Sequence, residues 1–154
     1  MPVIQEHVGN YDLLDCSKTA FLCSRKVAAG IVLKCYDWAI AEREAGNCVI
    51  SGFHSTIEKD VFHYLLKGSQ PIIIALHRGI GPDITTRFAS GIESGRLLMI
   101  SPFERKVSRG DKHTAAIRNL LMINLADQVV VGHASPGGEL EKLLQQINKQ
   151  IEFI

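Results

Sequence analysis

Several signatures that would assign a function directly are missing from this chain of 154 residues. It contains neither G-x-G-x-x-G nor G-x-x-x-x-G-K-[ST], the glycine-rich fingerprints of dinucleotide-binding enzymes and P-loop NTPases. Its four cysteines form no C-x-x-C pair and have no histidine at the spacing of a structural zinc site. The aspartates form no recognisable metal cluster either. The sequence therefore predicts no metal and no cofactor.

An excess of charge of one sign is also missing. Lysine and arginine number 17 and aspartate and glutamate 16, so the formal net charge is +1. This balance disfavours a protein that coats nucleic acid but allows a local basic patch. No apolar stretch approaches the ~20 residues that span a bilayer, and the first residues lack the basic and apolar regions of a signal peptide. Cys23, Cys35 and Cys48 lie among apolar residues, as buried free thiols do, so we expect a cytoplasmic protein.

Short apolar runs alternate with helical patterns along the chain. Strands are expected at residues 19–23, 48–50, 71–76, 97–100, 128–131 and 151–154. Helices are expected at residues 27–45, 56–67, 84–93 and 113–126, and in a last segment with Leu140, Leu143, Leu144 and Ile147 inside and Lys149 outside. This alternation predicts an α/β fold with a doubly wound, mainly parallel sheet and helices on both faces. We expect one domain with its core at about 19–154 and an N-terminal extension at 1–18.

The turns after the predicted strands are rich in Gly, Ser, Thr, Arg and His. In parallel sheets, ligands bind beyond the carboxyl ends of the strands, so these turns are expected to lie at the binding edge. Small residues also serve simply to make tight turns and to cap helices. Several such turns at one edge, two of them with arginine, favour a ligand that carries phosphate.

Arg118 and Asn119 interrupt a segment, residues 115–123, that is otherwise apolar on nearly every face. Arginine does not lose its charge and is costly to bury without a partner. Arg118 therefore pairs internally, with Glu58 or Asp127 as the partners considered, reaches solvent along its stem, or faces a ligand cleft. We favour the last arrangement, in which the guanidinium binds phosphate bidentately.

No catalytic residue is nominated. Glu58 and Glu139 lie near helix starts, where the helix dipole alone stabilises a carboxylate, and His54 beside Ser55 has no third group to orient it. The residues that we assign to nucleotide or phosphate binding are Ser24, Arg25, Ser51, Gly52, His54, Ser55, Thr56, Arg78, Arg118, Asn119, Gly137 and Gly138.

Four segments, in order along the chain, resemble the DprA (Smf) family of bacterial DNA-processing proteins. The family's opening strand and G-S-R-K turn are similar to FLCSRK at 21–26, and its V-S-G-x-A-x-G-I-D segment is similar to VISGFHSTIE at 49–58. Its R-N-R-I-I helix is similar to IRNLL at 117–121, and the strand after it to DQVVV at 127–131. The resemblance extends from about Thr19 onward. It is closest to short stand-alone DprA-like proteins.

The resemblance implies a Rossmann-like fold of the broader DprA/LOG (SLOG) superfamily. Full DprA proteins bind single-stranded DNA and help to load the recombinase RecA, commonly as homodimers. The resemblance thus implies a nucleotide or single-stranded DNA as ligand, a recombination protein such as RecA as partner, and a homodimer. It carries the phosphate site to Ser24, Arg25, Ser51, Gly52, Arg118 and Asn119.

Three positions depart from the DprA pattern. Cys23 replaces the glycine that opens the first motif, and Leu120 replaces the last arginine of R-N-R. The family also has an arginine within its second motif, in the stretch where this chain has His54, Ser55 and Thr56. The two missing arginines remove positive charge from the expected DNA groove.

A sister family supplies an enzymatic alternative. LOG-type phosphoribohydrolases, which release a base from a nucleoside monophosphate, carry P-G-G-x-G-T-x-x-E. Here Pro136, Gly137 and Gly138 are present, but Leu144 stands at the acidic position. Hydrolysis would then need Glu58 or Glu139 in its place. A non-catalytic module that senses one nucleotide is the other alternative.

Overall fold

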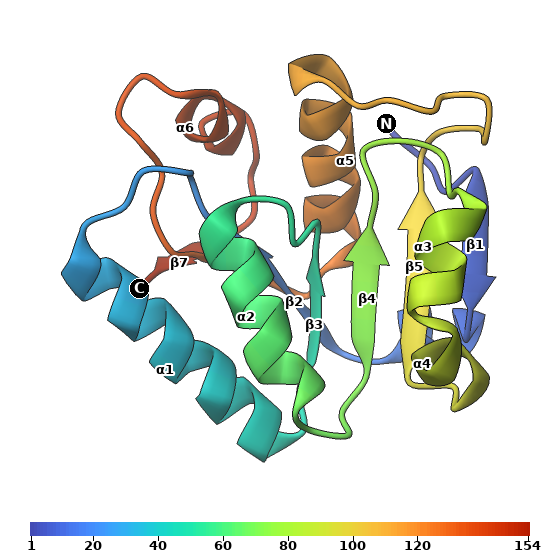
Figure 1. The fold of residues 1–154 in the computed structure, drawn as a ribbon. Helices are drawn as coiled ribbons and strands as arrows, with labels where there is room; N and C mark the ends of the chain where they lie inside the picture. The colour runs from blue at the N-terminus through green and yellow to red at the C-terminus, as the bar shows by residue number, and fades with distance from the viewer.

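A computed structural model describes residues 1–154, which form one seven-stranded sheet (Figure 1). Its strands are β1 (Glu6–Gly9), β2 (Lys18–Leu22), β3 (Cys48–Ser51), β4 (Ile72–Ala75), β5 (Leu97–Ser101), β6 (Gln128–Val131) and β7 (Ile151–Phe153). They lie in the order β1-β5-β4-β3-β2-β6-β7. All neighbours are parallel except β1, which pairs antiparallel with β5 at one edge.

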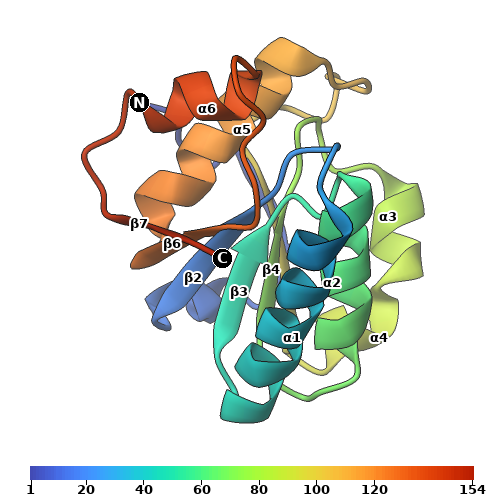
Figure 2. The ribbon, with the colours of Figure 1, turned by 90° about the vertical axis from the view of Figure 1, so that its left-hand side faces the viewer.

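Helices cover both faces of the sheet, as the end-on view in Figure 2 shows. One face carries α1 (Ala29–Ala45), α2 (Thr56–Leu66), α3 (Pro82–Arg87) and α4 (Ala89–Glu93). The other face carries α5 (Lys112–Leu125) and α6 (Glu139–Leu144). Every residue of β2, β3, β4 and β5 is buried, as expected for strands with helices on both sides. The predicted doubly wound, mainly parallel α/β fold is confirmed.

Each face of the sheet has its own hydrophobic core, because successive side chains of a strand point to opposite sides. Phe21 packs in the core under α1 and α2, where its ring stacks on Trp38 with centroids 4.9 Å apart. Leu22, the next residue, packs in the other core with Met122 of α5. Burial of both faces fixes the register of β2, which lies between β3 and β6 in the sheet.

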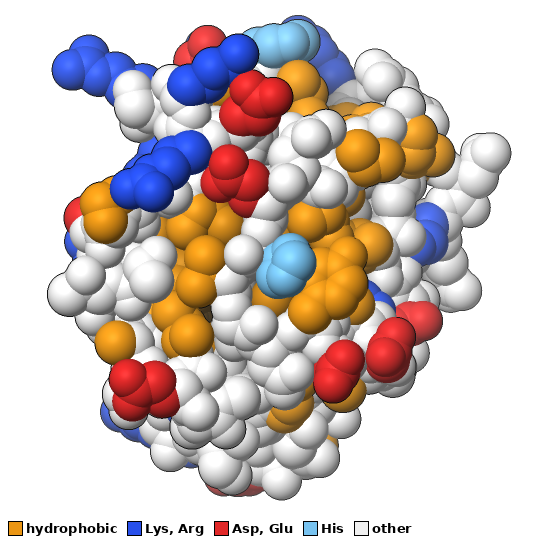
Figure 3. All heavy atoms as spheres, turned by 90° about the vertical axis from the view of Figure 1, so that its right-hand side faces the viewer, with side chains coloured by type: hydrophobic (Ala, Val, Ile, Leu, Met, Phe, Trp, Pro, Cys, Tyr) orange, Lys and Arg blue, Asp and Glu red, His pale blue; other side chains and the backbone are white.

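Part of the N-terminal segment pairs with the sheet. Glu6–Gly9 add β1 to the sheet, and a short 3-10 helix follows at Tyr11–Asp15. At Gly9 the backbone φ is +110°, and a side chain would place its Cβ only 2.4 Å from the carbonyl oxygen of Leu97. Glycine is therefore required where β1 meets β5. Figure 3 shows the face that carries β1, with hydrophobic side chains across its middle and basic ones near its upper end.

Two predicted helices have different limits in the structure. The helix expected at 84–93 starts earlier, with Pro82 in its first turn, and breaks at Phe88 into α3 and α4. The last helix ends at Leu144, although its apolar period continues to Ile147. Beyond the helix, the Lys149 ammonium donates to the carbonyl of Ile123, at 2.6 Å, and to that of Ala126. A helix continued through Lys149 would not allow these hydrogen bonds. These carbonyls lie at the open end of α5, where no intrahelical donor remains.

All four cysteines are free thiols, and Cys23, Cys35 and Cys48 are buried as predicted. Measured by length and apolar character together, every helix falls short of a membrane-spanning segment.

The chain order of the strands reverses around β2. From β2 the chain proceeds to β3, β4 and β5 on one side, and it then crosses to β6 and β7 on the other. In doubly wound sheets the ligand crevice lies at this reversal, outside the carboxyl ends of the strands. The fold therefore places the site beyond the ends of β2 and β6, at the upper edge of the sheet in Figure 1.

Candidate functional site

A cavity of about 400 Å³ opens at the carboxyl ends of β2 and β6. Its walls come from the loops after β2, β3 and β6, from the start of α2, and from α5 and α6. Four cationic side chains line it against two carboxylates. These are Arg25, Lys26, Lys112 and Arg118, with Glu58 and Glu139. The cavity thus carries the local basic patch that the balanced composition allowed.

Ser24 joins the two loops that frame the cavity. Its backbone N–H donates to the carbonyl of His133 at 2.8 Å, and its hydroxyl accepts from the N–H of Ser135 at 3.0 Å. The loops after β2 and β6 are therefore held side by side. Arg25 and Lys26 follow directly and are both exposed.

Arg118 is the most buried charged side chain of the cavity, with 4% of its surface exposed. Its Nε donates to Oδ1 of Asn119 at 2.7 Å, and its Nη1 donates to the carbonyl of Ala75 at 3.2 Å. A guanidinium has five N–H donors, and both of these acceptors are neutral. Burial lowers the pKa of Arg118, an effect partly offset by the nearby Glu58. The side chain is still a cation, with donors left for a ligand.

Neither carboxylate considered as an internal partner forms an ion pair with Arg118. The protein has three ion pairs, and Arg118 takes part in none of them. Asp127 instead accepts from the backbone N–H of Lys18 at 2.9 Å. Arg118 is therefore a buried cation held only by neutral groups.

Glu58 accepts hydrogen bonds from three backbone N–H groups. Its Oε1 accepts from His54 at 3.0 Å and from Ser55 at 3.1 Å, and its Oε2 accepts from Cys23 at 3.0 Å. The Ser55 hydroxyl accepts in return from the N–H of Glu58, which completes a capping box at the start of α2. Glu58 thus ties the end of β2 to the loop after β3.

Gly52 makes room for Arg118. A Cβ at Gly52 would lie 2.0 Å from Nη1 of Arg118, so only glycine allows the guanidinium to pack against this backbone. The preceding Ser51 is fully buried, and its hydroxyl donates to the carbonyl of Phe21 at 2.8 Å and accepts from the N–H of Phe53 at 3.2 Å. Ser51 and Gly52 support the site from beneath.

A pair of histidines lies beside Arg118. The rings of His54 and His77 have centroids 4.5 Å apart. Burial, followed by the charge of Arg118, lowers the pKa of His54 and lowers that of His77 to about 4. The backbone of Gly110 also packs against His77, since a Cβ there would lie 2.0 Å from its Cδ2. With these lowered pKa values, both rings are neutral at pH 7 in the free protein.

The free energy of unfolding should fall as the pH drops from about 6.5 toward 4, in part because of His77. The ordinary pKa of 6.5 is lowered in the folded protein to about 4, so the unfolded chain binds the proton more readily in this range. The stability that neutral His77 provides is complete above about pH 6.5 and is lost as the pH falls through the folded pKa. Denaturant unfolding at pH 7.5 and pH 5 measures this loss, which should be smaller in His77→Asn. An identical loss in the variant and the original protein would contradict this role of His77.

The structure brings together seven of the twelve residues assigned to the site from the sequence. Those that line the cavity are Ser24, Arg25, His54, Ser55, Arg118, Asn119 and Gly138. Of the others, Thr56 is exposed at the first position of α2. Arg78 turns toward Asp83, 3.6 Å away, and Gly137 (φ +73°) makes a tight turn. Ser51 and Gly52 lie behind Arg118, as described above.

Lys26 and Lys112 line the cavity but were not assigned to it from the sequence. Lys26 directly follows Arg25 in the first DprA-like motif, which was the available signal. Lys112 is the first residue of α5, one position before the predicted helix start. Its place at the cavity follows from where α5 begins, which the apolar pattern fixes only to within a residue or two.

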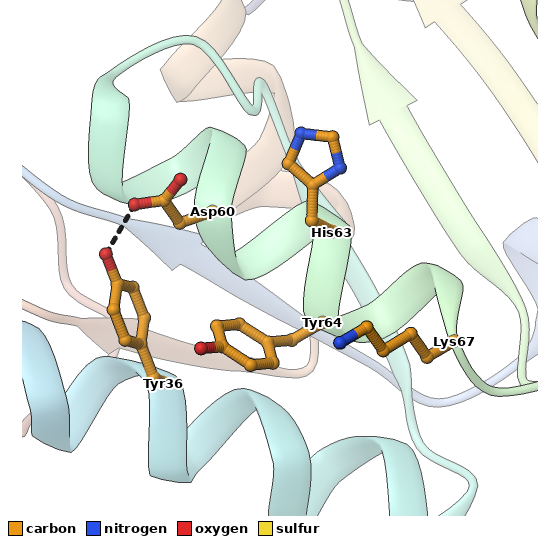
Figure 4. A pocket seen from close by; sticks show the side chains of 5 residues that line it. All are labelled: Tyr36, Asp60, His63, Tyr64 and Lys67. Atoms are coloured by element: carbon orange, nitrogen blue, oxygen red, sulfur yellow. Dashed lines mark hydrogen bonds between the residues drawn. The ribbon is translucent and has the colours of Figure 1, made fainter.

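A second hollow, of about 370 Å³, lies between α1 and α2, away from the carboxyl edge (Figure 4). The Tyr36 hydroxyl donates there to the Asp60 carboxylate, which raises the pKa of Tyr36 to about 12. Tyr64 lies against Tyr36, and the Lys67 ammonium lies 5.4 Å from the centre of the Tyr64 ring. The polar groups of this hollow are thus largely paired with one another, and its lining contains no cluster of cations that could bind phosphate.

Two solved structures of DNA processing protein A (DprA) share this fold. The X-ray structure from Streptococcus pneumoniae matches with a TM-score of 0.73 and 20% identity, over 96% of this chain and 53% of that one. The protein from Helicobacter pylori, described for its unique single-stranded DNA binding mode, matches with a TM-score of 0.74 and 21% identity, over 96% of this chain and 69% of that one.

The chain thus spans about half the length of the S. pneumoniae protein. No family model matches the sequence, and the curated proteins contain no match to it. The structural likeness shows that the chain has the Rossmann-like fold of DprA, as the sequence motifs predicted.

Proposed function

We propose that this chain, which has the Rossmann-like fold of the DprA proteins, binds single-stranded DNA through phosphates held in the cavity at the carboxyl edge of its sheet. The observation that carries the proposal is the buried Arg118 guanidinium, which has no carboxylate partner and lines that cavity. Burial of a charged group without an ion-pair partner costs on the order of several kcal/mol, and the charge of the nearby Glu58 offsets only part of this cost. A bound phosphate would compensate this penalty through charge-assisted hydrogen bonds.

Other cations and two helix starts favour an anion in the same place. Arg25 and Lys26 line the cavity from the loop after β2, and Lys112 lines it from α5. The N-termini of α2 and α5 add partial positive charge to its rim. Arg105, Lys106 and Arg109 are exposed in the loop before Lys112. A strand that leaves the cavity along this loop would meet further phosphate contacts.

The two carboxylates at the cavity have other contacts, which does not favour a role in hydrolysis. Both oxygens of Glu58 are engaged by backbone N–H groups. Leu144, at the acidic position of the LOG pattern, is buried in the core. Glu139 is exposed and lies 3.7 Å from the ammonium of Lys142. These positions support a binding module over a phosphoribohydrolase, in which a free carboxylate must face the sugar.

The test is the salt dependence of single-stranded DNA binding. Fluorescence anisotropy of a labelled dT20 strand, titrated with protein between 50 and 200 mM salt, should give a plot of log affinity against log salt. Four cations at the cavity, each in contact with a phosphate, correspond to a slope of about −3. Unlabelled mononucleotides should compete only weakly. Absence of binding at 50 mM salt would overturn the proposal, and full competition by one mononucleotide would favour the sensor alternative.

Partners of this chain are part of the same proposal. The likeness to DprA motivates a homodimer that acts with a recombinase such as RecA in the cytoplasm, where the four free thiols would stay reduced. Sedimentation equilibrium measures whether the chain forms a dimer. Co-sedimentation with purified RecA, with and without single-stranded DNA, measures binding to the recombinase.

A further inference from the structure

Two imidazole rings meet where the loops after β3 and β4 lie side by side. His54, in the loop after β3, is exposed and lines the cavity that holds Arg118. His77, in the loop after β4, is half-buried, and the centroids of the two rings are 4.5 Å apart. β3 and β4 are paired neighbours in the sheet, so their loops leave the same edge together. The phosphate-binding proposal counts only lysine and arginine side chains and makes no use of this pair.

The ring of His77 is held in place by backbone as well as by His54. A Cβ at Gly110 would lie 2.0 Å from its Cδ2 and 2.4 Å from its Nε2, so the backbone of Gly110 packs directly on the ring. Gly110 precedes Asp111, the N-cap of α5. A charge on His77 would therefore be partly desolvated, which disfavours its protonation. Of the two rings, His54 is the one that faces a ligand in the cavity.

Cations outnumber carboxylates around both rings. The charged groups that face His54 are Arg118 of α5, Glu58 and Lys59 of α2, and Arg25 from the loop after β2. Those that face His77 are Arg118, Arg78 beside it in the chain, and Asp111 at the start of α5. Burial, and after it this positive surround, holds the pKa of both rings below the ordinary value. The pair is therefore neutral until an anion arrives.

A phosphate at Arg118 would reverse the balance of charge beside His54, because both side chains line the same cavity. A nearby opposite charge favours the protonated form of an imidazole. Histidine changes its charge close to neutral pH, so a moderate change in its surroundings is enough to move a proton. Two rings in contact repel one another when both are charged, so the pair takes up one proton rather than two.

We infer that the pair of His54 and His77 takes up one proton from solvent when a DNA phosphate binds at Arg118, so that the site binds single-stranded DNA more tightly as the pH falls. The inference rests on the proposed function, because the phosphate must first be held at the cavity. The proton resides on His54, which becomes a fifth cation beside the four lysine and arginine side chains and donates an N–H to the phosphate. His77 stays neutral as a positioning residue. The proton returns to solvent when the strand leaves.

The experiment measures the affinity for labelled dT20 by anisotropy at pH 7.5, 6.5 and 5.5 and at constant salt. A strand without a terminal phosphate has no group that titrates in this range, so any pH dependence belongs to the protein. Uptake of one proton changes the affinity by at most about tenfold per pH unit, and we expect the dissociation constant to fall by about tenfold in total. The salt slope should steepen from about −3 to about −3.5 at pH 5.5, because five cations then meet phosphates instead of four.

Variants assign the proton to its ring. His54→Gln keeps a polar side chain that cannot be protonated, so most of the pH dependence should disappear. His113→Gln is the matched control, since His113 is exposed at the start of α5 beside Lys112 but does not line the cavity. It should keep the full tenfold change. Titration calorimetry at pH 6.5 in two buffers of different ionisation enthalpy counts the protons directly, and uptake should be present in the original protein and absent in His54→Gln.

The outcomes separate the two proposals. Binding of equal affinity at pH 7.5 and pH 5.5 would overturn the proton uptake and leave the phosphate site intact. An undiminished pH dependence in folded His54→Gln would also overturn the inference, because the proton would then reside elsewhere. Absence of binding at every pH would overturn the proposed function itself. Circular dichroism at each pH checks the fold, and the calorimetric count does not depend on the acid end of the range.

Discussion

Replacing Arg118 by methionine should remove most of the affinity for single-stranded DNA and leave the protein folded. The variant loses charged donors to phosphate, each worth about 1.5–3 kcal/mol, so the dissociation constant should rise by roughly 10-fold to 150-fold. The fold should survive because methionine fills similar space and the guanidinium has no carboxylate to leave unpaired. Anisotropy with dT20 and denaturant unfolding of the same samples measure the two effects.

Two further variants sharpen this result. Arg118→Lys keeps the charge but loses the planar fork of donors, so its affinity should lie between those of the original protein and Arg118→Met. Arg43→Met is the matched control, because Arg43 donates to the carbonyl of Tyr64 at 3.0 Å near the end of α1, far from the cavity. Unchanged DNA affinity in a folded Arg118→Met protein would sink the assignment of Arg118 to the phosphate site.

Replacing Glu58 by glutamine should have the largest effect on stability among the residues of the cavity. The carboxylate is buried and accepts from three backbone N–H groups. Glutamine keeps one acceptor oxygen and sets an NH₂ group against a backbone donor, so at least one buried N–H is left unpaired. The expected loss is about 2–4 kcal/mol. This corresponds to a fall in Tm of roughly 5–15 °C for a domain of this size.

Thermal unfolding followed by circular dichroism measures this loss. Glu139→Gln serves as the control, because Glu139 is exposed at the same cavity and interacts only with Lys142. Its Tm should change little, since exposed ion pairs contribute about 0–1 kcal/mol. If Glu58→Gln unfolds at the same temperature as the original protein, the three N–H groups do not depend on this carboxylate.

The central fold could be predicted from the sequence because its strands are buried on both faces. Such strands appear as continuous apolar runs, as at Ile72–Ala75 and Leu97–Ser101. β1 could not be predicted, because Glu6–Gly9 is a short edge strand with mixed side chains, and only its pairing with β5 defines it. The end of α6 could not be predicted either. It depends on hydrogen bonds from Lys149 to the carbonyls of Ile123 and Ala126, which lie 26 and 23 residues earlier in the chain.

The candidate site was predicted in part for similar reasons. Arg118 stood out because a charge in an apolar segment must be explained, whatever the fold. Its acceptors could not be predicted, since Ala75 is 43 positions away and Asn119 is its own neighbour. Arg78 was expected at the site from its turn, but its side chain interacts with Asp83 in the adjoining helix start. The left-handed φ of Phe53, the residue after Gly52, is likewise indicated by no pattern in the sequence.

The position of β2 between β3 and β6 has a consequence for how the site forms as the chain is synthesised and folds. β2 pairs with β3 and also with β6, and Ser24 at its end is bonded to the backbone of Ser135, 111 positions later. Contacts of such long sequence separation are slow to form. The cavity cannot exist until residues beyond 135 have left the ribosome. Until then β2 presents one open, apolar edge, which makes the nascent chain most prone to mispairing just before its site is complete.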